Sequence, residues 1–173
     1  MALKEGLTVF RDASFTSDLH SAAVKRIEDV SLLRNTQFRE DAGPTAHPIQ
    51  PDHYQAIDNF YTTTIYEKGS EVIRVLHTLL GEETFMRGMA LYVSRHDGTA
   101  ATCEDFVQAM QDAAPVPPPF DFAQFRRWYH QAGTPRLHIQ RHWDGETGVL
   151  ELQVQQHTPA TPGQSDRQPL VIP

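Results

Sequence analysis

The sequence predicts a mainly α-helical fold that is followed by the first strands of a β domain. Apolar residues recur at spacings of three and four through most of residues 1–133, which is the period of a helix with one buried face. From residue 134 onward apolar and polar residues alternate, which is the period of a strand. A chain of 173 residues can form one well-packed core and part of a second. We therefore expect a helical domain over residues 1–133 and a truncated β domain over residues 134–173.

Two helices are predicted before residue 41. The first covers Met1–Phe10 and begins without a capping residue, so we interpret it as a helix that has been cut. The polar stretch Ser14–Asp18 predicts a loop after it. The second is an ordinary amphipathic core helix. Its apolar positions are Ala22, Val24, Ile27, Val30, Leu33 and Phe38.

The strongest helical pattern runs from Asn59 to Gly81 and follows a proline-containing loop, Asp41–Asp58. A loop of that length is commonly functional or packed over a site. Gly81 suits the left-handed conformation that ends a helix. The helix start, Phe60–Tyr66, is aromatic or β-branched, which helix propensity disfavours, so we expect function or tight packing to shape it. The apolar stripe comprises Ile65, Gly69, Val72, Ile73, Leu76, Leu79 and Leu80.

Three further helices and a hairpin are predicted. One helix runs from Glu82 to Gly98, one begins at a capping box of Thr102 with Asp105, and one lies between Asp121 and Gly133. The proline run over residues 115–120 is interpreted as a spacer between helices rather than a docking motif. Strands are expected around residues 137–140 and 149–154, with a turn at residues 144–145. The final QPLVIP could open a third strand.

Composition narrows the function classes. The net charge of −7 argues against binding to nucleic acid or to an anionic membrane, because both normally need a basic surplus. Arg74 and His77 interrupt the most apolar helix, so no membrane span is predicted. No charged-then-apolar secretory signal opens the chain, so we expect a soluble, cytoplasmic protein unless an N-terminal segment has been removed.

Isolated cysteine and histidine residues give no metal site. Cys103 is the one cysteine, which excludes an internal disulfide and a cysteine-based zinc cluster. We interpret it as a buried or half-buried packing residue at the start of a helix. His47 and His53 lack a partner four residues on, so surface or hydrogen-bonded roles are favoured over metal ligation.

Five stretches in order along the chain carry a family resemblance. LKEGLTVFRD, NFYTTTIYEKGSEVIR, HDGTAAT, FRRWYHQAGTP and HTPATPGQ resemble segments of bacterial aminopeptidase N, the alanyl aminopeptidases of the gluzincin zinc metallopeptidase family. The resemblance implies a zinc peptidase that removes N-terminal residues from peptides. It also implies that residues 1–133 are the helical C-terminal lobe of a thermolysin-like catalytic domain, and that residues 134–173 begin a β-sandwich.

The resemblance assigns roles to five residues. Glu5 falls at the third zinc ligand, and Tyr66 at the catalytic tyrosine that donates to the oxyanion of the tetrahedral intermediate. Tyr61 and Lys4 fall at positions that line the substrate cleft. Asp12 falls at a position from which it would orient a zinc-ligating histidine without contacting the metal itself. From spacing alone, Glu5 and Asp12 are also typical of a solvated acidic face.

Two family motifs are absent. No histidine is followed by glutamate, so His-Glu-x-x-His, with two zinc ligands and the general base, is missing, as is Gly-x-Met-Glu-Asn, which grips the substrate amine. We therefore expect a segment truncated at both ends, whose partner is the missing upstream catalytic half. We expect zinc in the full-length enzyme, and neither zinc binding nor peptide cleavage by the isolated chain. The alternative hypothesis is a non-enzymatic helical interaction module derived from a peptidase lobe.

Overall fold

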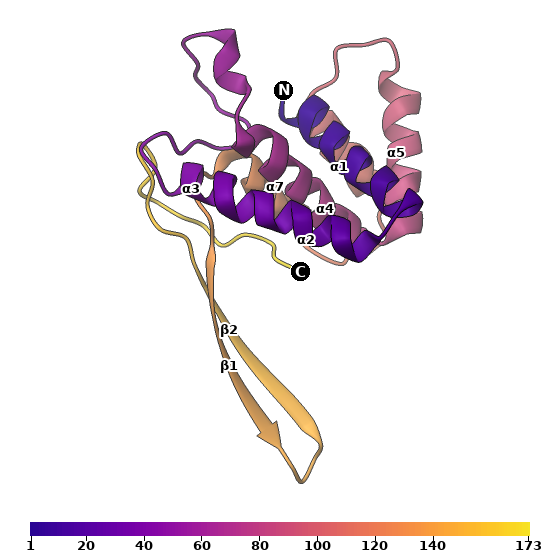
Figure 1. Ribbon diagram of the computed structural model, residues 1–173. Helices are drawn as coiled ribbons and strands as arrows, with labels where there is room; N and C mark the ends of the chain where they lie inside the picture. The colour runs from indigo at the N-terminus through magenta and orange to yellow at the C-terminus, as the bar shows by residue number, and fades with distance from the viewer.

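Helices make up most of the chain up to His130 in the computed structural model, which describes residues 1–173 (Figure 1). The predicted class, mainly helical with strands at the end, is confirmed. The α-helices are α1 (Ala2–Leu19), α2 (Ala22–Leu32), α3 (Phe38–Asp41), α4 (Gly69–Leu80), α5 (Glu82–His96), α6 (Cys103–Ala113) and α7 (Phe122–His130). A π-helical stretch η1 (Leu33–Gln37) joins α2 to α3, and a second, η3 (Thr64–Lys68), leads into α4. None of the helices has the length and apolar character needed to cross a bilayer.

Helix α4 supplies the centre of the core, as its apolar stripe predicts. Val72, Ile73 and Leu76 are at most 2% exposed, and they pack in one cluster with aromatic side chains of α6 and α7. Gly81 follows α4 with a positive φ of 74°, which lets α5 begin at the next residue.

The helical segment begins at Thr64, five residues later than predicted. Asn59 instead belongs to a 3₁₀ turn, η2 (Ile57–Phe60), where its side-chain oxygen accepts from the backbone N–H groups of Gln55 and Ala56. The Thr62 hydroxyl accepts from the N–H of Ile65, which satisfies one free donor at the helix start.

The loop predicted over Ser14–Asp18 is wrong, because α1 continues to Leu19. The hydroxyls of Ser14 and Ser17 donate to the carbonyl oxygens of Phe10 and Ala13, one turn back. These bonds satisfy the polar side chains inside the helix, so a polar composition did not require a loop here.

Helix α2 exists as predicted, but its predicted role as a core helix is wrong. None of its residues is buried; Ile27 is 70% exposed and Val24 is 54% exposed. The half-buried residues of α2 are Lys25, Arg26, Asp29 and Val30, and three of these four are charged. The apolar period therefore located the helix but not the face that points inward.

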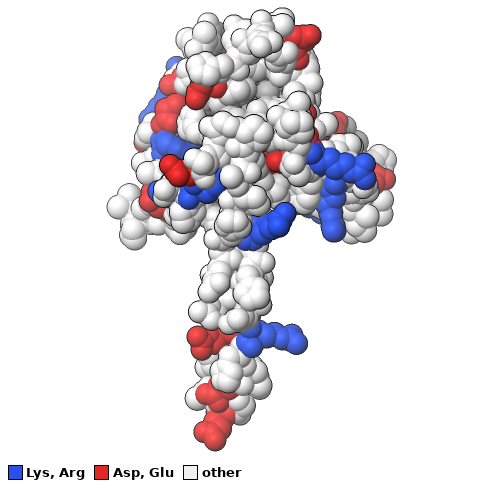
Figure 2. All heavy atoms as spheres, turned by 90° about the vertical axis from the view of Figure 1, so that its left-hand side faces the viewer, with Lys and Arg blue, Asp and Glu red and all other residues white.

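The strands β1 (Arg136–Asp144) and β2 (Val149–His157) form the predicted hairpin. They pair antiparallel from Arg136 opposite His157 to Asp144 opposite Val149. The hairpin extends away from the helices as a narrow arm with acidic side chains toward its tip (Figures 1 and 2). Apolar side chains of both strands are exposed, Ile139 and Leu152 at 56% each.

The third strand expected at the end of the chain is not formed. Residues 168–173 instead run back along α7 (Figure 1). Leu170 and Val171 are buried in the helical core, and the indole N–H of Trp128 donates to the Val171 carbonyl oxygen at 2.8 Å. Burial against α7 therefore replaces strand pairing for this segment.

Candidate functional site

Two glycines let α1 and α4 touch through their backbones. A Cβ atom added to Gly6 would lie 2.8 Å from the carbonyl carbon of Gly69, closer than van der Waals contact allows. Glycine inside a helix costs about 0.5–1 kcal/mol relative to alanine, so its presence here follows from the close approach. The crossing brings the first turn of α1 beside η3.

Four of the predicted site residues meet at this crossing. Lys4 and Glu5 come from α1, Tyr66 from η3 and Tyr61 from the segment before it. The Lys4 ammonium lies 3.0 Å from a Glu5 carboxylate oxygen, and the Tyr61 and Tyr66 ring centroids are 6.3 Å apart. We call these four residues the Glu5–Tyr66 cluster.

The cluster has a defined electrostatic character. Desolvation raises the pKa of the Tyr66 phenol, and the hydrogen-bonding and charge of the adjacent Glu5 carboxylate raise it further, so the phenol stays protonated and can donate. The hydrogen bond to Glu5 likewise raises the pKa of Lys4. The Glu5 side chain is 14% exposed, while that of Lys4 is 65% exposed. A protonated phenol beside a partly shielded carboxylate can donate a hydrogen bond to a developing negative charge.

Asp12 lies apart from this cluster. It is exposed on α1, two turns beyond Glu5. Its charge contributes to the raised pKa of Lys25, whose largest cause is a hydrogen bond to Asp29. It also contributes to the raised pKa of Glu67, for which burial is the largest cause. The structure therefore brings together four of the five predicted site residues and leaves Asp12 beside α2.

The threonines before Tyr66 explain the unusual helix start. One carboxylate oxygen of Glu40, in α3, accepts from the Thr63 hydroxyl at 2.9 Å, the Thr64 N–H at 2.7 Å and the Thr64 hydroxyl at 2.6 Å. Sequence reasoning missed Glu40. The signal was three consecutive hydroxyl side chains where a helix begins, which need an acceptor.

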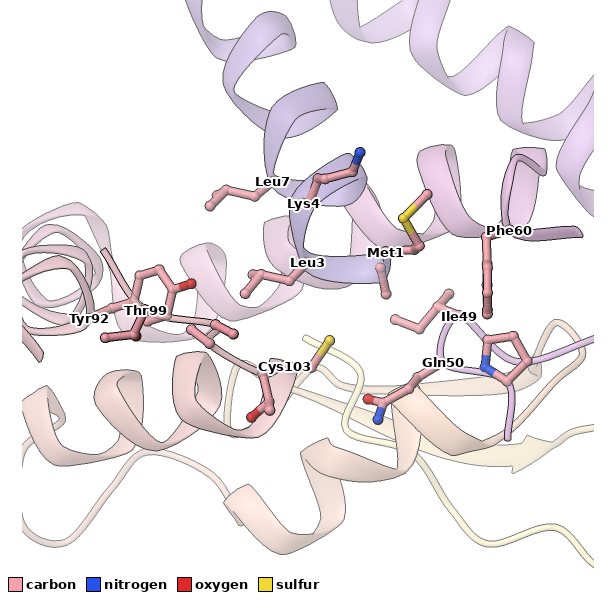
Figure 3. A pocket seen from close by; sticks show the side chains of 15 residues that line it. Met1, Leu3, Lys4, Leu7, Ile49, Gln50, Phe60, Tyr92, Thr99 and Cys103 are labelled. Atoms are coloured by element: carbon pink, nitrogen blue, oxygen red, sulfur yellow. The ribbon is translucent and has the colours of Figure 1, made fainter. Parts of the chain in front are cut away.

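A cavity of about 540 Å³ adjoins the cluster at Lys4 (Figure 3). It lies between the first turn of α1, the segment near Ile49 and the start of α6 at Cys103. Cys103 is half-buried, as predicted, and burial raises the pKa of its thiol. A space of this size beside the cluster is large enough for a few side chains of a bound segment.

The two histidines in the long loop differ in their surroundings. His47 has both ring nitrogens hydrogen-bonded, to the Thr45 carbonyl oxygen and the Thr62 hydroxyl, each at 2.8 Å. His53 is exposed. The predicted hydrogen-bonded or surface roles are therefore confirmed.

The donor set of this chain does not fit a complete zinc centre. A catalytic zinc takes three protein ligands and keeps a fourth position open. Nowhere in the chain do three histidine, cysteine, aspartate or glutamate side chains converge in a way that could hold a metal ion. Glu5 can offer one oxygen ligand. A catalytic zinc ion would need further ligands that this chain does not provide.

Comparison with known proteins identifies related sequences over the whole chain. Residues 1–128 match the peptidase family M1 domain, and residues 133–173 match a domain of unknown function with an Ig-like fold. Aminopeptidase N of Escherichia coli is 58% identical over 173 residues, which is all of this chain and 19% of that protein. Aminopeptidase N of Haemophilus influenzae is 54% identical over the same span and share. This chain thus spans about a fifth of the length of these relatives.

A solved structure shares the fold. Aminopeptidase A of Legionella pneumophila, crystallised in complex with aspartic acid, superposes with a TM-score of 0.73 at 25% identity. The match covers 91% of this chain and 17% of that one.

Proposed function

The chain belongs to peptidase family M1, and from this premise we propose that it forms part of the active site of a zinc-dependent aminopeptidase that removes N-terminal residues from peptides. The observation that carries the proposal is the convergence of Glu5 and Tyr66 across the glycine crossing. A carboxylate and a protonated phenol from distant parts of the chain meet there, beside an aromatic side chain and a lysine. The whole activity requires groups that this chain does not contain.

Each residue of the cluster has a proposed role. Glu5 supplies one oxygen ligand to a zinc ion whose other ligands come from elsewhere in a longer polypeptide. Tyr66 donates a hydrogen bond to the carbonyl oxygen of the scissile bond as negative charge develops on it. Tyr61, which is 57% exposed, forms an aromatic wall on the substrate side, and Lys4 lines the cleft. Asp12 would orient a ligand that lies outside this chain.

A chimera with the Escherichia coli relative tests these roles, because that protein aligns with all 173 residues. In the chimera this chain replaces the aligned segment, and hydrolysis of an alanyl chromogenic amide and bound zinc are both measured. We expect Tyr66→Phe to lower kcat by about 10²–10³-fold with KM little changed, because the lost hydrogen bond forms mainly in the transition state. Glu5→Ala should lose zinc as well as activity.

Matched controls separate these roles from general damage. Tyr54→Phe removes a phenol hydroxyl from an exposed ring outside the Glu5–Tyr66 cluster, and Glu146→Ala removes a carboxylate from the hairpin turn. Both variants should keep full activity and zinc. A folded, zinc-loaded chimera in which Tyr66→Phe changes kcat by less than about twofold would contradict the proposed role of Tyr66.

The isolated chain provides a second test. Since it offers one carboxylate to a metal that needs three ligands, it should neither bind zinc tightly nor cleave the amide. Equilibrium dialysis that found one zinc per chain at sub-micromolar affinity would contradict this expectation.

A further inference from the structure

A buried ion pair lies two residues beyond Tyr66. The Lys68 ammonium donates to Asp41 Oδ2 at 2.8 Å and to the Gly133 carbonyl oxygen at 2.9 Å. Asp41 also accepts from the Gly133 N–H at 2.9 Å and from the Thr134 hydroxyl at 3.0 Å. Asp41 is 3% exposed and Lys68 is 6% exposed. Three segments meet at this point, namely the end of α3, the end of η3 and the chain that leads from α7 to β1.

The other end of η3 is held by the same part of the chain. Glu40, next to Asp41, accepts three hydrogen bonds from Thr63 and Thr64, and the Gln37 amide donates to the Thr64 hydroxyl at 3.2 Å. Gln37 and Thr64 are both buried. The π-helical stretch that carries Tyr66 is therefore anchored before and after that residue.

This arrangement suits the control of geometry better than the gain of stability. A π-helical turn is rare and commonly marks a functional site, and anchors at both ends fix the direction of the side chains between them. A buried ion pair often contributes no more to stability than apolar residues of the same volume would. The Asp41–Lys68 pair instead holds the end of α3, the end of η3 and the chain from α7 to β1 in one defined arrangement.

We propose that Asp41 and Lys68 are positioning residues for Tyr66, holding the π-helical turn so that the phenol faces Glu5. The inference rests on the proposed function of Tyr66. We call Asp41 and Lys68, together with the groups of Gly133 and Thr134 that they bind, the clamp. It therefore includes the junction between the helical lobe and the hairpin. The attachment of the β domain is thereby coupled to the position of the phenol.

The chimera with the Escherichia coli relative tests the proposal. Lys68→Met removes the ammonium at nearly constant length, and Asp41→Asn/Lys68→Met leaves no unpaired buried charge, which protects folding. We expect both variants to lower kcat by about 10- to 100-fold with KM nearly unchanged, since a small displacement of a group that acts in the transition state has this effect. In a Tyr66→Phe background the same changes should lower kcat no further, because the group that they position is already absent.

A second ion pair between the same helical segments is the matched control. Arg26 donates to both carboxylate oxygens of Glu71, at 2.6 and 2.8 Å, and Glu71 lies in the first turn of α4, just after Lys68. Arg26→Met should leave kcat and KM unchanged. If Tyr66→Phe lowers kcat while the Lys68 and double variants keep it, or if their effects multiply with that of Tyr66→Phe, the positioning role is overturned and the proposed function stands. If Tyr66→Phe itself has no effect, the proposed function fails and the inference falls with it.

Discussion

Helices α2 and α4 both pack against α1, but they present opposite faces to the core. Helix α4 buries its apolar stripe, with Leu76 at 0% exposure. Helix α2 turns Lys25, Arg26 and Asp29 toward its neighbours and leaves Ile27 at 70% exposure. Charged groups on the neighbouring surface, Glu71 among them, hold the polar face of α2 in place. An amphipathic period therefore locates a helix, while the surface beside it decides which face is covered.

Ion pairs at two places join the segments that contain these helices. Asp41 and Lys68 are buried, while the Arg26 and Glu71 side chains are 42% and 24% exposed. Removing one partner of a buried ion pair lowers the free energy of unfolding strongly, whereas removing one partner of an exposed pair lowers it little. The contrast in burial predicts that substitutions at these positions lower stability to different degrees, most at the buried pair and least at the exposed pair.

The largest effect is expected from Asp41→Asn. This change leaves the Lys68 ammonium buried without its counter-charge, which typically costs about 3–5 kcal/mol. Urea unfolding of the 173-residue chain at neutral pH measures the loss. Asp29→Asn, which removes the half-buried partner of Lys25 on α2, is the matched control and should cost far less.

The same carboxylate predicts an acid dependence. Burial alone would raise the pKa of Asp41, but the Lys68 charge and hydrogen bonds from Lys68, Gln37 and Gly133 outweigh it and hold the pKa below its usual range. The unfolded chain then binds more protons than the folded chain as pH falls through the ordinary carboxyl range. Stability contributed by Asp41 is therefore present above that range and lost below it, and Asp41→Asn should flatten this part of the pH profile. An unchanged acid profile would contradict the assignment.

Leu76→Ala tests the apolar side of the comparison. Leu76 is fully buried at the centre of the core, so truncation should cost about 2–5 kcal/mol from lost burial and the cavity left behind. Ile27→Ala is the matched change on the exposed face of α2 and should stay within about 0.5 kcal/mol. Equal losses for the two variants, measured by urea unfolding, would show that α2 packs its apolar face in solution.

Gly6→Ala tests the backbone contact that brings Glu5 to Tyr66. The new methyl group meets the Gly69 backbone, which cannot move aside as a side chain can, so we expect a loss of about 1–3 kcal/mol. Gly145→Ala in the hairpin turn is the control, because the nearest atom to the new methyl group there is the indole nitrogen of Trp143, 3.9 Å away. Thermal unfolding should rank Gly6→Ala as clearly more harmful; the reverse order would mean that α1 and α4 lie farther apart.

The sequence predicted the order and type of the helices and the hairpin because these follow from local periods and capping residues. The capping box of Thr102 with Asp105 was read correctly and is formed. Asp41, Glu40 and Lys68 were not predicted, because their partners lie 23 or more residues away in sequence and no local pattern records such pairing. Of the site, Glu5 and Tyr66 came from family resemblance, and no periodicity could have shown that a glycine crossing brings them together.

The smallest effect is expected from Arg26→Met. The methionine keeps most of the apolar stem of the arginine, so the change removes mainly the charge and the bidentate bond to Glu71. Glu71 retains a second partner in Arg74 at 3.3 Å and stays partly hydrated, so its carboxylate is not left isolated. Partly exposed pairs of this kind contribute about 0–1 kcal/mol, and salt at physiological strength screens charges beyond about 8 Å. Urea unfolding at low and high salt should therefore find a small loss that shrinks as salt is added. A loss above about 2 kcal/mol that salt does not reduce would place this pair with Asp41 and Lys68, and the polar face of α2 would then be a second buried core rather than a solvated contact.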